Sequence, residues 1–353
     1  MKNRIVFDVG HPGQVHQFKH VYWELEKIGW ECIFVAKDKD ITIDLLKEYK
    51  LDYFRLSESR KGLLNKIIQV PRNDWNFYLI VKNFKPDFIL NRFSIHSGHI
   101  SKLLKIINIG FSDTEHAVKL HKLTIPFVDI KFTGKTYYNN LGKNHIKYDS
   151  NIELFYLHPD IFKPSIDPYA LLEIPANSKY CLIRFVSWKA HHDVGIRHMS
   201  WDEKIRLVEI MKSQYKVFIS SEGPLPKELH DHKIQINPIH IHSILKEASF
   251  YIGEGGTMAS EAACLNTPVI YINPLPIMGY LKEQSDFGLL FQTTNLNEIQ
   301  KLIISGFSDK TRNHSKYISQ KINPVKFIVW FIENYPDSLR IIKENPDYQD
   351  RFR

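Results

Sequence analysis

Short runs of apolar residues alternate with longer amphipathic stretches through the first half of the chain. The runs rich in β-branched and aromatic residues predict strands, at residues 5–9, 32–36, 88–90, 107–111 and 127–132. Helix-length segments lie between some of them, at residues 15–28 and 95–105. Strands alternating with helices, with Gly or Pro between them, are typical of a parallel sheet covered on both faces. We therefore predict a doubly wound domain in this half.

The same alternation begins again in the second half. Strands are predicted at residues 180–185, 216–220, 249–252 and 269–272, and helices at residues 202–213 and 257–265. This pattern predicts a second doubly wound domain. The fold class is therefore α/β, with two doubly wound, Rossmann-like domains, and two similar domains imply a cleft that they face.

A proline-rich stretch separates the two series. Residues 158–168 contain three prolines, which exclude a continuous helix or a central strand, so we place the linker there. The predicted domains are residues 1–160 and 169–323. Residues 325–335 look helical, and by analogy we expect residues 324–353 to pack back on the first domain.

Composition and charge narrow the classes of function. Of the 353 residues, 43% are hydrophobic and 24% are charged, which excludes extended disorder and fibrous repeats. The net charge of +8 comes from scattered lysines, which fits phosphate ligands without indicating nucleic acid. Cys32, Cys181 and Cys264 stand far apart, as expected of reduced thiols in a cytoplasmic protein. The first apolar run is too short for a signal-peptide core, and no run reaches the length of a transmembrane helix.

The strongest local signal is a glycine-rich turn that follows the predicted strand 249–252. Gly253, Gly255 and Gly256 fall within four residues and open a helix at Thr257. Glycines allow close approach of the backbone to a ligand, and a helix N-terminus favours a diphosphate. Glu261, about one turn into the helix, could then accept hydrogen bonds from ribose hydroxyls. The turn is neither a Walker A nor a GxGxxG motif, and a tight connection with glycines for packing is the alternative.

The first strand also ends in a loop with polar side chains, where open α/β sheets bind ligands. His11 and His16 each offer an imidazole that could act as general base on an acceptor hydroxyl. With 17 histidines in the chain, a structural role for either is the simpler alternative. His16 and His20 are four residues apart, but no third ligand completes a zinc set, so we predict no metal.

Another polar cluster follows the strand 107–111. Asp113 or Thr114 could cap the next helix, and for Asp113 a role in function is an equal alternative. Glu115 and His116 exceed what a cap requires, and either could be the catalytic base or orient a sugar.

Polar residues also end the first two strands of the second domain. Arg184, Ser187 and His191 suit a pyrophosphate or carboxylate, with a solvated loop as an equal alternative. Ser221 and Glu222 lie where the base or ribose of a nucleotide would bind in a doubly wound domain.

One segment leaves membrane contact open. Residues 61–70 mix lysines with apolar positions, which fits either a peripheral membrane helix or a helix that faces the core.

Five of these segments together resemble the uncharacterised family labelled domain of unknown function 354, which is itself similar to UDP-N-acetylglucosamine 2-epimerases and to GT-B glycosyltransferases. The matching segments are residues 8–12, 112–117, 182–188, 219–223 and 253–261. The resemblance implies a GT-B architecture, with the nucleotide held by the C-terminal domain, the acceptor by the N-terminal one, and no bound metal. Synthesis of an extracellular or capsular polysaccharide would be the usual setting.

The leading hypothesis is a metal-independent glycosyltransferase that needs no cofactor. Its partners would be a nucleotide-sugar donor and a saccharide or lipid-linked acceptor, in the cytoplasm or at the inner face of the membrane. The helix dipole and Arg184 would stabilise the departing diphosphate. A UDP-sugar 2-epimerase and a non-catalytic nucleotide-sugar-binding protein are the alternatives.

Overall fold

The protein is described from a computed structural model that covers residues 3–58, 63–164, 166–186, 198–305 and 312–353. The chain divides into two compact units. The first consists of Met1–Tyr156 together with Gln320–Arg353, and the second is Leu157–Ser319.

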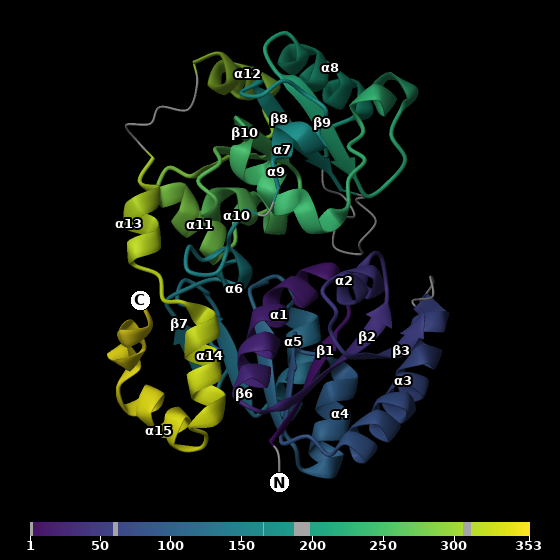
Figure 1. The fold of residues 1–353 in the computed structure, drawn as a ribbon, viewed down its shortest axis with the longest axis vertical. Helices are drawn as coiled ribbons and strands as arrows, with labels where there is room; N and C mark the ends of the chain where they lie inside the picture. The colour runs from purple at the N-terminus through teal and green to yellow at the C-terminus, as the bar shows by residue number, and fades with distance from the viewer. Residues whose placement is uncertain (1–2, 59–62, 165, 187–197, 306–311) are drawn as a thin grey trace. The chain divides into compact units, whose positions relative to one another are not determined.

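The first unit is built on one sheet of parallel strands in the order β3-β2-β1-β4-β5-β6-β7 (Figure 1). The strands are β1 (Arg4–Val9), β2 (Glu31–Asp38), β3 (Tyr53–Glu58), β4 (Phe88–Asn91), β5 (Ile107–Ser112), β6 (Ile130–Gly134) and β7 (His145–Tyr148). The order reverses at β1, because β2 and β3 extend the sheet on one side and β4 to β7 on the other.

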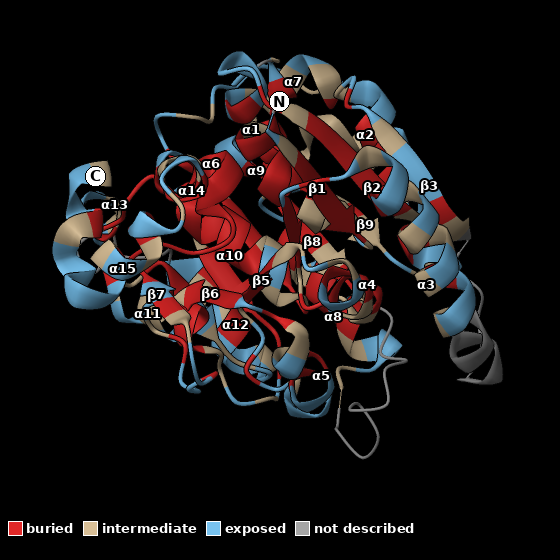
Figure 2. Ribbon diagram, turned by 90° about the horizontal axis from the view of Figure 1, so that it is seen from below, coloured by how far each residue is buried: buried red, intermediate tan, exposed pale blue. Residues whose placement is uncertain are grey.

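Helices cover both faces of this sheet. They are α1 (Pro12–Lys27), α2 (Thr42–Glu48), α3 (Leu63–Phe84), α4 (Ile95–Leu104), α5 (Val118–Thr124) and α6 (Leu154–Leu157), with the 3-10 helix η1 (Ile125–Phe127). Since βαβ crossovers are right-handed, the reversal of strand order places α1 and α2 on one face and α3, α4 and α5 on the other. Contacts agree, because α1 touches α2 whereas α4 touches both α3 and α5 (Figure 2).

The C-terminal segment Gln320–Arg353 belongs to the first unit. It forms α14 (Pro324–Glu333), α15 (Asp337–Glu344) and the 3-10 helix η4 (Pro346–Phe352). Helix α14 lies against α1, and its Phe331 ring packs edge-on to Phe132 of β6, with ring centroids 5.0 Å apart. The aromatic core of the first unit is therefore completed by residues that are nearly 200 positions away in the chain.

The second unit is built on a smaller parallel sheet in the order β12-β11-β10-β8-β9. Its strands are β8 (Tyr180–Phe185), β9 (Lys216–Ser221), β10 (Phe250–Gly253), β11 (Val269–Tyr271) and β12 (Leu290–Gln292). Its helices are α7 (Pro168–Leu171), α8 (Trp201–Lys212), α9 (Ile241–Glu247), α10 (Gly256–Cys264), α11 (Gly279–Asp286), α12 (Leu296–Ser305) and α13 (His314–Ser319), with the 3-10 helices η2 (Lys227–His232) and η3 (Pro238–His240). Helix α8 begins with a capping box in which Ser200 and Glu203 each accept a backbone hydrogen bond from the other.

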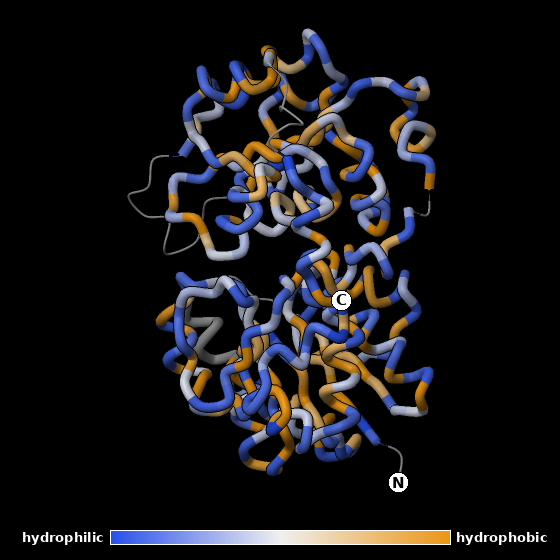
Figure 3. Tube along the Cα trace, turned by 90° about the vertical axis from the view of Figure 1, so that its left-hand side faces the viewer, coloured by the Kyte–Doolittle hydropathy of each residue, from blue (hydrophilic) through white to orange (hydrophobic). Residues whose placement is uncertain are grey.

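The predicted fold class is confirmed, since two parallel sheets with alternating helices form two Rossmann-like units. Hydrophobic segments gather on the strands of each unit (Figure 3). The prediction missed the three strands β3, β7 and β12, which all lie at sheet edges. It also began the strand at 127 too early, because Ile125–Phe127 form η1 and β6 starts at Ile130.

A membrane-spanning segment was not expected from the hydropathy pattern. Within the described ranges, no helix combines the length and the apolar character needed to cross a bilayer.

Candidate functional site

The second unit has its topological switch point at β8, which pairs with β9 on one side and β10 on the other. In register across these strands lie Ser220, Arg184 and Gly253, all near the carboxyl ends. In open α/β sheets, ligands bind in the crevice outside the carboxyl ends at such a point. The glycine-rich turn therefore lies where the fold itself favours a ligand.

The glycines of this turn serve both packing and access. A Cβ on Gly253 would lie 2.0 Å from the Tyr251 hydroxyl, so close packing alone requires this glycine. Gly255 is the N-cap of α10, and Gly256 is its first residue. Both are only partly buried, and Thr257 is exposed. The packing alternative thus explains Gly253, whereas Gly255 and Gly256 line an accessible helix N-terminus.

The N-terminus of α10 is suited to an anion. No side chain caps it, and its first turn contains no acidic residue. The first backbone N–H groups of a helix have no intrahelical acceptor, and the helix dipole adds about half a positive charge there. A phosphate group could accept these hydrogen bonds and would be stabilised by the dipole.

Arg184 lies beside the turn and supplies a cation. Its guanidinium donates to Ser220 Oγ at 2.6 Å and to Glu222 Oε1 at 3.1 Å. Two predicted residues, Arg184 and Glu222, are therefore joined directly. Ser221 is on the adjacent strand end, where its Oγ accepts from the Gly223 N–H. The predicted residues Ser187 and His191 lie outside the described residues.

Glu254 of the turn is held by a buried ion pair that the sequence analysis missed. Its Oε1 lies 2.8 Å from Lys204 Nζ, and its Oε2 accepts from the Val186 N–H at 3.0 Å. Lys204 is buried between the rings of Phe185 and Trp201. The ion pair ties the turn after β10 to α8, and the hydrogen bond from Val186 ties it to the end of β8, so the two contacts together fix the position of the turn.

Glu261 is buried and ion-paired. Its Oε1 lies 3.1 Å from His242 Nε2 of α9. The pair holds the carboxylate one turn into α10, on the helix whose N-terminus forms the candidate anion site. To contact ribose as predicted, the Glu261 carboxylate would accept a second hydrogen bond, from a ribose hydroxyl, besides its contact with His242.

In the first unit, the two histidines of the first turn have different environments. His11 is exposed and caps α1, since its Nδ1 accepts from the Gly13 N–H at 3.3 Å. His16 is buried, with its ring against those of Tyr49 and Tyr156. Exposure favours His11 over His16 as a group that could reach a substrate.

The cluster after β5 does not cap a helix, so the capping alternative for Asp113 and Thr114 is wrong. Helix α5 begins at Val118, and its N-cap is Ala117, which makes no side-chain cap. Asp113 is instead paired with the Arg92 guanidinium, and Thr114 Oγ1 donates to Asp113. Glu115 is buried and His116 is exposed, so only His116 of this predicted pair lies at the surface.

A buried polar cluster lies at the switch point of the first sheet, between β1 and β4. Asp8 Oδ2 accepts from Ser97 Oγ at 2.5 Å and lies 3.3 Å from His96 Nε2. Burial acts to raise the pKa of the Asp8 carboxyl, but His96 and Lys37 outweigh it and lower the value to about 2. The motif around Asp8 was noted in the sequence, but nothing there linked it to His96, which is 88 positions away.

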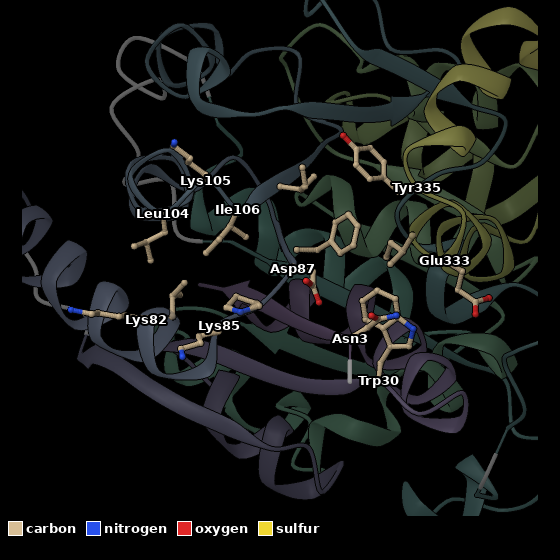
Figure 4. A pocket seen from close by; sticks show the side chains of 15 residues that line it. Asn3, Trp30, Lys82, Lys85, Asp87, Leu104, Lys105, Ile106, Glu333 and Tyr335 are labelled. Atoms are coloured by element: carbon tan, nitrogen blue, oxygen red, sulfur yellow. The ribbon is translucent and has the colours of Figure 1, made fainter. Parts of the chain in front are cut away.

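The first unit also has a cavity of about 580 Å3. It lies at the opposite edge of the sheet, near the starts of β4 and β5, and includes Trp30 and Phe88. Figure 4 shows the lysines Lys82, Lys85 and Lys105 on one side of it and Tyr335 on the other. Because this cavity lies at the amino ends of the strands, it is separate from the candidate groups of the first unit, which lie at the carboxyl ends.

Two Rossmann-like domains with polar groups at their carboxyl edges define the GT-B class of fold. Several solved structures with this architecture are similar to this chain over nearly its whole length. UDP-GlcNAc 2-epimerase from Methanocaldococcus jannaschii has a TM-score of 0.67 at 14% identity, covering 94% of this chain and 99% of its own. The corresponding enzyme from Rickettsia bellii has a TM-score of 0.68 at 14% identity, with 98% and 99% covered. MurG from Acinetobacter baumannii has a TM-score of 0.54 at 15% identity, with 94% and 99% covered.

The chain itself belongs to the family described as a protein of unknown function, DUF354, whose model matches residues 4–157 and 202–336. An uncharacterized protein of M. jannaschii is 23% identical over an alignment of 319 residues, and the match covers 83% of this chain and 88% of that protein.

Proposed function

We propose that this protein is a metal-independent GT-B glycosyltransferase that uses a nucleotide-sugar donor. The observation that carries the proposal is the uncapped N-terminus of α10, which lies at the switch point of the second sheet and has no acidic residue in its first turn. Such a terminus binds the diphosphate that links a nucleotide to its sugar. Similar structures include M. jannaschii UDP-GlcNAc 2-epimerase in complex with UDP-GlcNAc and UDP.

In this proposal the donor lies on the second unit. The N–H groups at Gly255, Gly256 and Thr257 bind the diphosphate, and the helix dipole stabilises the charge that develops as the sugar leaves. Arg184 is held by Ser220 and Glu222 and adds a fixed cation. Glu261 accepts from the nucleoside hydroxyls, and the Ser221 hydroxyl accepts from them or donates to them.

The acceptor is activated by a group on the first unit. His11 is the best placed, because it is exposed at the carboxyl end of β1. Its Nδ1 lone pair accepts the long cap bond from Gly13, so taking a proton at that atom would break the cap. His116 is the exposed second choice, while Glu115 and His16 would act from buried positions. The acceptor is a saccharide or a lipid-linked saccharide, in polysaccharide synthesis on the cytoplasmic side.

A UDP-sugar 2-epimerase is the second candidate. Its support is that the UDP-GlcNAc 2-epimerases from M. jannaschii and R. bellii superpose with TM-scores of 0.67 and 0.68, against 0.54 for MurG. This reaction inverts a sugar carbon through cleavage and re-addition of the diphosphate, and it needs paired acid and base groups. Glu115 and His116 are the pair available for it.

Purified protein incubated with a panel of nucleotide-sugars separates the two reactions. A transferase releases nucleoside diphosphate only when an acceptor extract is added, whereas an epimerase forms a new sugar epimer from UDP-sugar alone, visible by NMR. Binding of a nucleotide without either product would leave a binding protein. If no nucleotide or nucleotide-sugar binds in calorimetry, the proposal fails.

The variant Thr257→Glu tests the anion site directly. A carboxylate in the first turn of α10 would repel a diphosphate but interact favourably with the helix dipole. We therefore expect nucleotide affinity to fall at least tenfold, about 1.4 kcal/mol, with no loss of thermal stability. Thr257→Gln is the matched control, since it has similar size and no charge. Equal affinity of the Glu and Gln variants would contradict binding at this terminus.

A further inference from the structure

One face of the first unit is strongly basic. Helices α3, α4 and α5 share this face, and their sequences contain a single acidic residue, Asp74. That carboxylate is engaged, because Asp74 Oδ2 lies 2.8 Å from His99 Nδ1. Among the side chains of these helices that the structure describes, the exposed cations are Arg72, Lys82, Lys102, Lys119 and Lys122. We call this surface the basic face.

The cations of the basic face have no acidic partners among the described residues. Neither Lys119 nor Lys122 is within ion-pair distance of a carboxylate in the part of the chain that the structure describes. The opposite side of the unit differs, since there Lys27 pairs with Glu24 and Arg340 pairs with Asp337. The basic face is therefore an uncompensated positive surface and not a salt-bridged one.

Large apolar side chains are exposed on the same face. Leu103 of α4 and Leu123 of α5 are each 66% exposed, and Trp75 of α3 is 61% exposed. Smaller exposed fractions are found for Leu79 and Leu120. Figure 2 shows exposed colouring along the outer sides of α3 and α5. Apolar surface on this scale marks an interaction site in a protein that is otherwise well packed.

The helix α5 illustrates how the two features combine. Val118, Leu120 and Leu123 alternate with Lys119 and Lys122, and all five are exposed. Apolar residues that enter the acyl boundary, flanked by lysines that meet lipid phosphates, are the pattern of an interfacial helix. Tryptophan, present here as Trp75, favours the same membrane interface.

We infer that the basic face docks the protein on a membrane that contains anionic phospholipids. Charge complementarity decides between occupants, because a protein partner would need a matching acidic surface, whereas anionic lipids supply negative charge and an apolar layer together. The cavity at the ends of α3 and α4 continues the face and adds Lys85 and Lys105. The inference concerns binding alone, so it holds or fails independently of the reaction proposed above. It also places the contact on other residues than the segment 61–70, for which the sequence left a membrane contact open beside a helix that faces the core.

The full chain should co-sediment with vesicles of phosphatidylcholine and phosphatidylglycerol, and much less with phosphatidylcholine alone. Raising the salt concentration should weaken the association, since each surface lysine interacts through a screened potential. Trp75 fluorescence should be quenched by doxyl-labelled lipid in these vesicles. The part of the quenching that is lost in the Trp75→Phe variant measures the insertion of Trp75.

Charge-reversal pairs locate the surface. Lys119→Glu with Lys122→Glu should weaken vesicle binding at least tenfold, because the two changes remove attraction and add repulsion. Lys47→Glu with Lys326→Glu makes the same change in net charge on the exposed opposite side, on α2 and α14, and should change binding by no more than about twofold. Leu103→Ser with Leu123→Ser should also weaken binding, while leaving the fold intact because both side chains are exposed.

Three results would overturn the inference. One is no association of the wild-type chain with anionic vesicles. Another is equal loss in the two charge-reversal pairs, which would indicate general electrostatic attraction without a docking face. The third is binding to a soluble polyanion such as heparin without vesicle association, which would identify a polymer-binding surface instead.

Discussion

One buried ion pair joins a helix of the second unit to the glycine-rich turn after β10. Lys204 and Glu254 are 6% and 2% exposed at their side chains and lie 2.8 Å apart. Removing one partner of such a pair leaves the other charge without compensation in a poorly solvated site. The pair therefore ties the geometry of the glycine-rich turn to the stability of the second unit.

We predict that Lys204→Met lowers the free energy of unfolding of the second unit by about 3–5 kcal/mol, because Glu254 loses its cation. The double variant with Glu254→Gln should recover part of this loss, since no buried charge remains. Urea denaturation followed by circular dichroism measures both. Lys212→Met on the same helix is the control, because its pair with Glu209 is exposed and should cost less than about 1 kcal/mol. A similar loss for both lysines would show that the helix, and not the buried pair, is responsible.

Asp8 gives the first unit a pH dependence whose sign follows from its pKa. The carboxyl has a pKa of about 2 in the fold and about 3.9 when unfolded. Its contribution, about 2.6 kcal/mol, is therefore complete above about pH 5 and is lost as the pH falls through 4 towards 2.

Asp8→Asn should remove that contribution at pH 7 and flatten the decline of stability between pH 4 and 2. Urea midpoints measured across this range check the effect. Asp44→Asn on the exposed side of α2 is the control. If stability declines between pH 4 and 2 in the same way in the wild type and in Asp8→Asn, the pairing of this carboxylate in the fold is contradicted.

Individual site residues were predictable only where a local motif marks them. The turn 253–257 was identified because glycines follow an apolar run directly. Lys204 could not be identified, since on an amphipathic helix it resembles any solvated lysine until Glu254 is placed beside it. His96 has the same problem, because it lies on α4 and its partner Asp8 is on β1, 88 positions earlier in the sequence.

At the scale of elements, buried strands were predicted well, whereas three of the four edge strands were missed. The central strand Tyr180–Phe185 was predicted with its observed bounds, since all of its residues except Arg184 are apolar or aromatic and buried. The edge strands β7 and β12 are only four and three residues long, and each contains few buried apolar positions. Short, half-exposed strands have no distinct periodicity, so they are formed by pairing with a neighbour and not by local preference.

The start of α5 was misplaced for a related reason. Asp and Thr after a strand usually predict an N-cap, but Arg92 at the end of β4 takes Asp113 into an ion pair. The helix then begins five residues later, at Val118. A tertiary contact thus overrides a local capping signal, and the same contact lines up the carboxyl ends of β4 and β5.

For the whole molecule, the central fact is that the two units are built from the chain in different ways. The second unit is one continuous segment, whereas the first needs the last 34 residues of the chain. Asp149 accepts from Lys135 and from the buried Lys321, each at 2.9 Å, and its backbone N–H donates to Gln349. These charged contacts, together with the aromatic packing of α14, attach the C-terminal segment firmly to the first sheet.

This arrangement predicts which fragments fold. We expect residues 157–319, produced alone, to fold cooperatively and to bind nucleoside diphosphate with an affinity within about tenfold of that of the full chain, because the donor groups all lie in this segment. Residues 1–156 alone should not fold stably, since Phe132 and its neighbours lose the buried face of α14. Adding residues 320–353 as a separate peptide or by a linker should restore the fold. Far-UV circular dichroism, thermal melting and calorimetry with UDP test each fragment. A folded 157–319 fragment without nucleotide affinity would mean that the first unit contributes directly to donor binding, and a stable 1–156 fragment would mean that the C-terminal segment is an accessory to that unit.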